Sequence, residues 1–142
     1  MAATLNLYNS FKVNMANGTI DVDTDIMRVL LYQTVGGLSD ATFSSKGSIS
    51  ASEVANGNGY VTGGKTLSNV SYALSGANAK FDADDTFWSA TGAITSMKAF
   101  VILVSGANEL VGWGRLSTTS VSLTSTNRVT LQWAATGIYT VS

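Results

Sequence analysis

The sequence contains no cysteine, no histidine and no proline. The absence of cysteine excludes disulfide bonds and thiolate chemistry, so folding does not depend on an oxidising compartment. Without histidine or cysteine, the usual catalytic triads, imidazole bases and zinc sites are excluded as well, and only carboxylate pairs or a serine–lysine arrangement remain for catalysis. We therefore expect no enzymatic activity, no cofactor and no metal.

Charged residues are also scarce, at 12% of the chain with a net charge of -1. This is about half the usual share in globular proteins. Because soluble proteins repel one another through dispersed charge, the composition favours a subunit of an assembly over a free monomer. A monomer with a polar, uncharged surface is the alternative. Eight Lys and Arg residues against nine Asp and Glu form no basic stripe, so nucleic acid is not an expected partner.

Long hydrophobic runs are missing too. The longest apolar stretch, residues 99–104, is too short for a signal-peptide core or a membrane span. We expect no membrane partner and a chain that is made and folded in a cytosol.

What the sequence does contain is typical of β structure. Fourteen glycines supply turns, and abundant Ser, Thr, Val and aromatic residues suit a pleated surface. Short apolar or alternating segments recur with turns about every 8 to 12 residues, which predicts a mostly β fold. The expected fold is one antiparallel β-sandwich or barrel-like domain over residues 1–142, with strands at residues 26–33, 67–74, 80–83, 99–104, 110–116, 121–123, 128–133 and 138–141.

Three of these segments carry more specific expectations. Residues 99–104 are apolar throughout, which predicts a central strand buried on both faces. Residues 80–83 are short and next to acidic residues, as in an edge strand. Alternation in the segment 110–116 places two sets of side chains on opposite faces: Leu110, Gly112, Gly114 and Leu116 on one, and Val111, Trp113 and Arg115 on the other.

Two short helical segments are expected. Tyr8, Phe11 and Met15 have helical spacing and Asn17-Gly18 provides a stop, which predicts a short N-terminal helix. Residues 48–55, which include Glu53, could form a further helical turn. Alternatively, residues 1–20 form an arm that reaches a neighbouring subunit through Leu5, Leu7, Tyr8 and Phe11.

Residues 59–66 match the phosphate-binding expression G-x-x-x-x-G-K-T letter for letter. The mechanism of that motif requires a buried parallel strand before the loop and a helix after it. Polar, Gly-rich residues precede this match, and β-type alternation follows it. We therefore interpret the segment as a glycine-rich turn and not as a nucleotide site.

Two acidic clusters are candidate cation sites. Asp21, Asp23 and Asp25 alternate along the chain and could converge on Ca²⁺ in a loop. The expected Gly and terminal Glu of a calcium loop are absent, so local capping of backbone amides is the favoured interpretation. The cluster of Asp82, Asp84 and Asp85 is interpreted in the same way.

The tryptophans allow two interpretations. Trp88, Trp113 and Trp133 could stack on apolar sugar faces, with Trp113 or Trp133 as the platform of a carbohydrate-binding β-sandwich. Aromatic residues in alternating strands are more often core or subunit interface. We therefore include Trp113 and Trp133, with the N-terminal apolar residues, as interface candidates.

An ordered series of short motifs is more specific than any one of them. The sequence has Tyr-Asn-x-Phe-Lys at residues 8–12, Ile-Asp-x-Asp-Thr-Asp at 20–25, Gly-Tyr-x-x-Gly-Gly at 59–64 and Phe-Asp-Ala-Asp-Asp-x-x-Trp at 81–88. In this order the chain resembles a family of small structural proteins of tailed bacteriophage particles. The likeness covers about residues 5–104, and residues 105–142 contain no such motif.

The resemblance implies a non-enzymatic virion protein, with a capsid decoration (cement) protein as the leading expectation. Such a protein would form a homo-oligomer, for which a trimer is one arrangement, and would pack on the major capsid protein or other virion proteins. A tail, neck or receptor-binding component of the virion is the alternative within this class.

Overall fold

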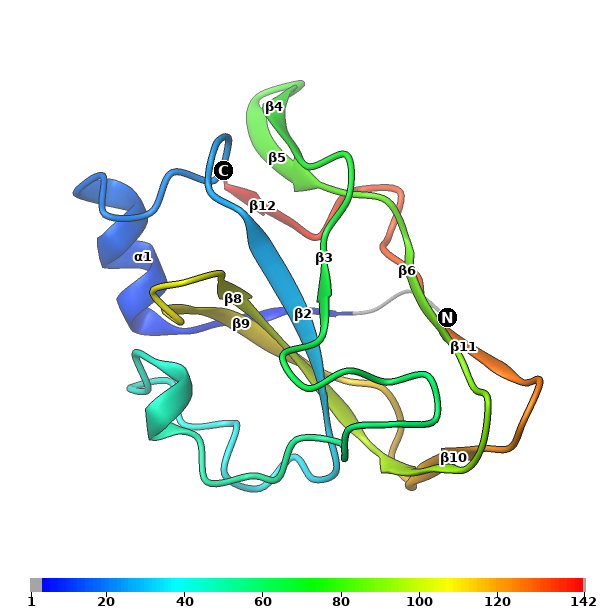
Figure 1. Ribbon diagram of the computed structural model, residues 1–142. Helices are drawn as coiled ribbons and strands as arrows, with labels where there is room; N and C mark the ends of the chain where they lie inside the picture. The colour runs from blue at the N-terminus through cyan, green and yellow to red at the C-terminus, as the bar shows by residue number, and fades with distance from the viewer. Residues whose placement is uncertain (1–3, 142) are drawn as a thin grey trace.

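The computed structural model describes residues 4–141 and is mostly β, with 41% of residues in strands and 8% in helix. All strand pairs in this range are antiparallel. These features confirm the expected mostly β, antiparallel fold with a short N-terminal helix. The sheets form a sandwich-like arrangement, and residues 4–141 contain no closed barrel (Figure 1).

A five-stranded sheet forms the centre of the fold. Its order is β1 (Asn6–Leu7), β9 (Leu110–Arg115), β8 (Ala99–Val104), β2 (Met27–Tyr32) and β3 (Lys65–Thr66). All six residues of β8 are buried, which confirms the central strand expected from its apolar run. β2 pairs with β8 over its whole length, so these two strands are the frame on which other elements pack.

Smaller sheets surround this centre. β10 (Val121–Leu123) pairs with β7 (Ile94–Met97), and β11 (Arg128–Leu131) pairs with β6 (Thr86–Ser89). A three-stranded sheet has the order β12 (Tyr139–Val141), β5 (Asn78–Asp82) and β4 (Ser71–Ser75). The β4–β5 hairpin projects from one end of the molecule, away from the five-stranded sheet (Figure 1).

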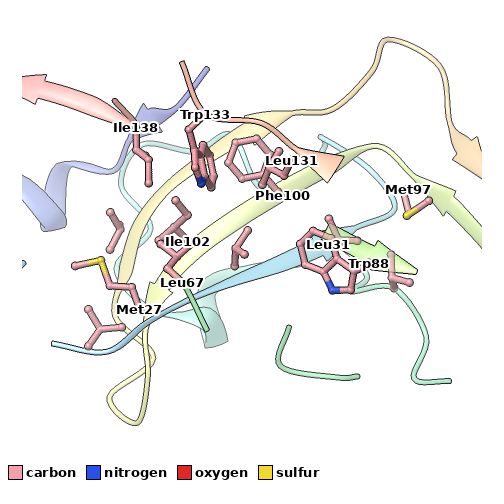
Figure 2. Packing of buried hydrophobic residues seen from close by; sticks show 14 of the residues in the cluster. Met27, Leu31, Leu67, Trp88, Met97, Phe100, Ile102, Leu131, Trp133 and Ile138 are labelled. Carbon is pink, nitrogen blue, oxygen red and sulfur yellow. The ribbon is translucent and has the colours of Figure 1, made fainter. Parts of the chain in front are cut away.

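Side chains on the two faces of the five-stranded sheet enter two separate clusters. Leu31, Phe100 and Ile102 belong to the larger cluster, where Trp88 and Trp133 also pack (Figure 2). Their sequence neighbours in β2 and β8 point the other way, into a smaller cluster that contains Leu30, Tyr32, Val101, Leu103, Tyr8 and Leu38. Because strand side chains alternate, burial on both faces requires the unbroken apolar run that β8 supplies.

The N-terminal helix α1 (Asn9–Ala16) packs on this sheet through Phe11, which is 0% exposed. It ends where the Asn17 N–H donates to the Val13 carbonyl, and Gly18 follows with φ +79°. A positive φ is readily adopted only by glycine among common residues, so the predicted helix stop is confirmed.

Several local expectations were wrong. Residues 49–55 are not helical: a single 3₁₀ turn, η1 (Lys46–Ser48), reaches only the first residue of the expected segment 48–55, and Glu53 forms an extended bridge with Tyr32. β4 begins at Ser71 and not at residue 67, because Asn69 has φ 50° and turns the chain. The segment around Phe81 is not an edge strand, since β5 lies between β4 and β12.

The faces assigned to β9 were also wrong, because the pairing with β8 shifts between Ile102 and Leu103. This β-bulge accommodates one extra residue and reverses the alternation beyond it. Leu110 and Trp113 pack with the smaller cluster, whereas Val111 packs with the larger one. A Cβ at Gly114 would meet the Phe100 ring, so Gly114 faces away from Leu110.

Candidate interaction surface

The six interface candidates from the sequence have different exposures. Tyr8 and Phe11 are each 0% exposed, and Trp133 is 6% exposed. The remaining three, Leu5, Leu7 and Trp113, are half-buried and pack against the two clusters of this chain. β1 pairs with β9, so residues 6–16 pack on the chain's own sheet. Tyr8, Phe11 and Trp133 therefore have almost no side-chain surface to offer a partner.

The tryptophans do not form a shared platform. Trp88 is 1% exposed, and Trp133 packs edge-on against Phe100 with ring centroids 5.7 Å apart. The Trp133 indole N–H donates to the Asp84 carbonyl, and the Asp85 carboxylate accepts the Trp133 backbone N–H. Trp133 is thus an anchor of the C-terminal segment, and only Trp113 keeps part of its ring at the surface.

The glycine-rich segment 59–66 is held by a network centred on Glu53. One carboxylate oxygen of Glu53 accepts bonds from the Tyr60 hydroxyl at 2.7 Å and from the Gly63 N–H at 2.6 Å. The other accepts a bond from Lys46 at 2.8 Å. The Arg28 guanidinium donates to the Gly63 and Gly64 carbonyls, each at 2.7 Å. Burial is the main cause of the raised pKa of Tyr60, which keeps its hydroxyl protonated.

This geometry differs from that of a phosphate-binding loop. The segment continues into β3, which pairs antiparallel with β2, and no helix follows it. Its amides already bond within the chain, since Gly63 donates to Glu53 and Gly64 donates to Val61. Lys65 extends the other way and donates to the Phe87 carbonyl at 2.6 Å. Residues 59–66 therefore form a structural turn that is held by hydrogen bonds to Glu53 and Arg28 and leads into the edge strand β3.

The first acidic cluster bonds within its own turn, as expected. The second was expected to do the same, but it does so only through Asp82, whereas Asp84 and Asp85 accept bonds from Asn69 and from the Trp133 backbone, which are distant in the sequence. Asp21 and Asp25 carboxylates accept backbone N–H groups within their own turn. Asp82 pairs with Lys80 at 2.8 Å, and Asp84 accepts a bond from Asn69 at 2.6 Å. Within the described part of the chain, no three acidic residues are grouped so that they could hold a metal ion.

Charge is sparse on the folded surface as well. Residues 4–141 contain two ion pairs, Lys46–Glu53 and Lys80–Asp82. Lys65 and Arg128 instead lie over the ring of Phe87, each 4.8 Å from its centroid. Phe87 is 43% exposed, so these two cations cover an aromatic side chain that would otherwise face water.

The clearest exposed apolar side chain is Leu74, in the projecting β4–β5 hairpin. It is 83% exposed, more than the other large exposed apolar residues Val13, Ile26, Val61 and Phe87. β4 is the outer strand of its sheet, and its five residues, Ser71–Ser75, carry no charge. This surface could not be recognised from the sequence, because the pattern of residues 67–74 indicates a strand but not the position of that strand in a sheet.

Comparisons with known proteins found no matching family model, no similar curated protein and no similar solved structure. Within residues 4–141, no helix has the length and hydrophobicity needed to cross a membrane. The phage resemblance therefore remains a prediction that depends on the ordered sequence motifs.

Proposed function

We propose that this chain is a structural protein of a tailed-bacteriophage particle, and specifically a decoration protein that seats on the outside of the head. The observation that carries the proposal is the low share of charged residues, 12%, together with an open, uncharged strand edge at β4. Such a surface is suited to permanent contact with other subunits, because isolated proteins normally protect strand edges with charge, proline or irregularity.

The expected mechanism is passive stabilisation. Each contact that joins neighbouring subunits removes apolar surface from water, at roughly 25 cal/mol per Å². A protein that binds only the assembled shell shifts the equilibrium away from dissociated subunits. Because charged residues make up only 12% of the chain, we expect contacts through apolar and hydrogen-bonding groups, which depend relatively little on salt.

The test is to locate the chain in purified particles. Mass spectrometry should detect it in many copies, and labelled antibody should decorate the head in electron micrographs. Particles that lack the chain should lose their contents at a lower temperature than complete ones. Antibody confined to the tail tip would contradict the decoration role and favour the tail alternative. Absence from particles would contradict the whole structural class.

A further inference from the structure

Strand β4 is the outer strand whose edge is least protected. Elsewhere in the described range the outer strands are blocked or short: β1 and β3 have two residues each, β12 has three, β11 carries Arg128, and β10 pairs irregularly with β7. Lys65 covers part of β6 by bonding to the Phe87 carbonyl. β4 has five residues in regular register with β5 and contains neither charge nor bulge. Edges of this kind pair with further strands.

The register of the hairpin determines which backbone groups are available. Ser75 pairs with Asn78 across the two-residue turn Gly76-Ala77, and Gly76 has φ +65°. In such a hairpin the closing pair exchanges both backbone bonds, and bonded and non-bonded pairs then alternate. The N–H and C=O groups of Tyr72 and Leu74 therefore point away from β5. Neither residue has another backbone partner in the described range.

We propose that a second copy of this chain pairs with this edge, β4 against β4, in antiparallel orientation about a twofold axis at Ala73. Tyr72 of each copy then lies opposite Leu74 of the other, and Ala73 lies opposite Ala73. Four backbone hydrogen bonds form, two from each Tyr72–Leu74 pair. The two three-stranded sheets become one six-stranded sheet, and the edge is covered.

The side chains fit the same arrangement. Tyr72 and Leu74 lie on one face of β4, because strand side chains alternate. Leu74 of one copy therefore meets Tyr72 of the other. Beside Tyr72 lies an open surface pocket of about 270 Å³, lined also by Met15, Gly18, Ile20, Asp21 and Val22, so the tyrosine ring has free space next to it.

A second copy suits this edge as its occupant. Within β4, Tyr72 and Leu74 present the free backbone groups, and a twofold operation exchanges these two positions, so one copy offers the other a matching set. An uncharged edge also pairs with itself without repulsion. The contact is isologous and twofold, so it differs from the threefold arrangement considered from the sequence, although further contacts could combine with it.

The first test is charge reversal at the axis, measured by sedimentation of the full chain over a range of concentrations. We expect the wild-type chain to dimerise. Ala73→Lys and Ala73→Glu each place like charges face to face, so each should raise the dimer dissociation constant about tenfold or more. An equimolar mixture of the two variants should recover the dimer, because the charges are then opposite. Val61→Lys, which changes a 64% exposed residue elsewhere, is the matched control and should dimerise normally.

The second test uses the absence of native cysteine. Ala73→Cys should form an intermolecular disulfide on mild oxidation, because residues opposite each other in a non-bonded pair have Cα atoms about 4.5 Å apart. Ser71→Cys is the register control: its two copies lie about 13 Å apart along the strands, so it should not cross-link alone. A mixture of Ser71→Cys and Ser75→Cys should cross-link.

The inference deepens the proposed function, and its failure can be told apart from a failure of that function. Two results would overturn the β4 contact. One is a chain that stays monomeric at all concentrations. The other is a dimer whose dissociation constant is unchanged by the Ala73 variants and that cross-links with Ser71→Cys alone. Absence from phage particles would overturn the decoration role while leaving the dimer intact.

Discussion

The five-stranded sheet and the β4–β5 hairpin differ both in composition and in what covers them: β8 is apolar throughout, whereas β4 and β5 mix apolar residues with Ser, Asn, Lys and Asp. Every residue of β8 is buried, whereas four of the five residues of β4 are exposed and Tyr72 is half-buried. β8 has a strand on each side and a cluster on each face, while β4 has one neighbour and an uncovered outer edge. The comparison shows that apolar side chains are enclosed at the centre of the sheet, whereas the apolar Leu74 of the hairpin stays exposed to solvent.

The largest effect should come from the centre of the sheet. Phe100→Ala removes a fully buried ring that packs against Trp133, and it should lower the free energy of unfolding by about 3–5 kcal/mol in denaturant titrations. Phe87→Ala is the matched control, because Phe87 is 43% exposed, and it should cost about 1 kcal/mol. Equal losses in the two variants would contradict the contrast between buried and exposed regions.

The Glu53 network should give the next largest effect, since it joins the glycine-rich turn to the sheet. Glu53→Gln keeps the shape of the side chain but removes the charge that Lys46, Tyr60 and the Gly63 amide share. We expect a loss of about 2 kcal/mol in thermal or chemical unfolding.

Glu109→Gln is the control for this variant. It removes the same charge from a half-buried side chain that makes no hydrogen bond within residues 4–141. This control should change stability by less than about 0.5 kcal/mol. A Glu53→Gln variant as stable as wild type would show that the turn is held by Arg28 and the backbone alone.

Alkaline pH should weaken the buried sheet through its tyrosines. Burial is the main reason that the pKa of Tyr32 is raised from 10.0 to about 12, and burial also raises the pKa of Tyr8. Because the folded state holds these protons more tightly than the unfolded state, their stabilisation is complete below pH 10 and is lost as pH rises towards 12.

Each such tyrosine should lower stability by about 1.4 kcal/mol per pH unit in this range. Phenolate absorbance and far-ultraviolet circular dichroism, recorded together, provide the check. The expected result is that buried tyrosines ionise only as the β signal is lost. Full ionisation at pH 10 with the fold intact would contradict the assigned burial.

The smallest effect on stability should come from the hairpin. Leu74→Ser changes a side chain that is 83% exposed, so stability measured at concentrations where the chain is monomeric should change by less than about 0.5 kcal/mol. Dimerisation should nevertheless weaken, because the apolar contact with Tyr72 of the second copy is lost. A large loss of monomer stability would mean that Leu74 belongs to the core and not to a contact surface.

The sequence was a good guide where one strand carried its own signal. The short apolar run in β8 indicated a doubly buried strand, and the helix stop at Asn17-Gly18 was local. Elsewhere the local structure depends on an interaction with residues that are distant in the sequence. The faces of β9 depend on a bulge that arises from pairing with β8, and Glu53 is extended because it bridges to Tyr32.

The interaction surface was harder to predict for the same reason. Alternation cannot tell an edge strand from a central one, since that distinction depends on which strands pair in three dimensions. Residues 80–83 look like an edge because of their acidic neighbours, yet β5 is central and β4 is the edge. Hydrophobicity likewise predicts Tyr8, Phe11 and Trp133 as interface residues, but all three are buried within this chain.

Amide hydrogen exchange, followed residue by residue at low and high protein concentration, tests the account most directly. The amides of Val29 and Phe100, inside the five-stranded sheet, should be protected at both concentrations. Those of Tyr72 and Leu74 should exchange rapidly when the chain is dilute and become protected when it is concentrated. If they exchange rapidly at every concentration while the chain associates, the β4 edge is not the surface through which it meets its neighbours.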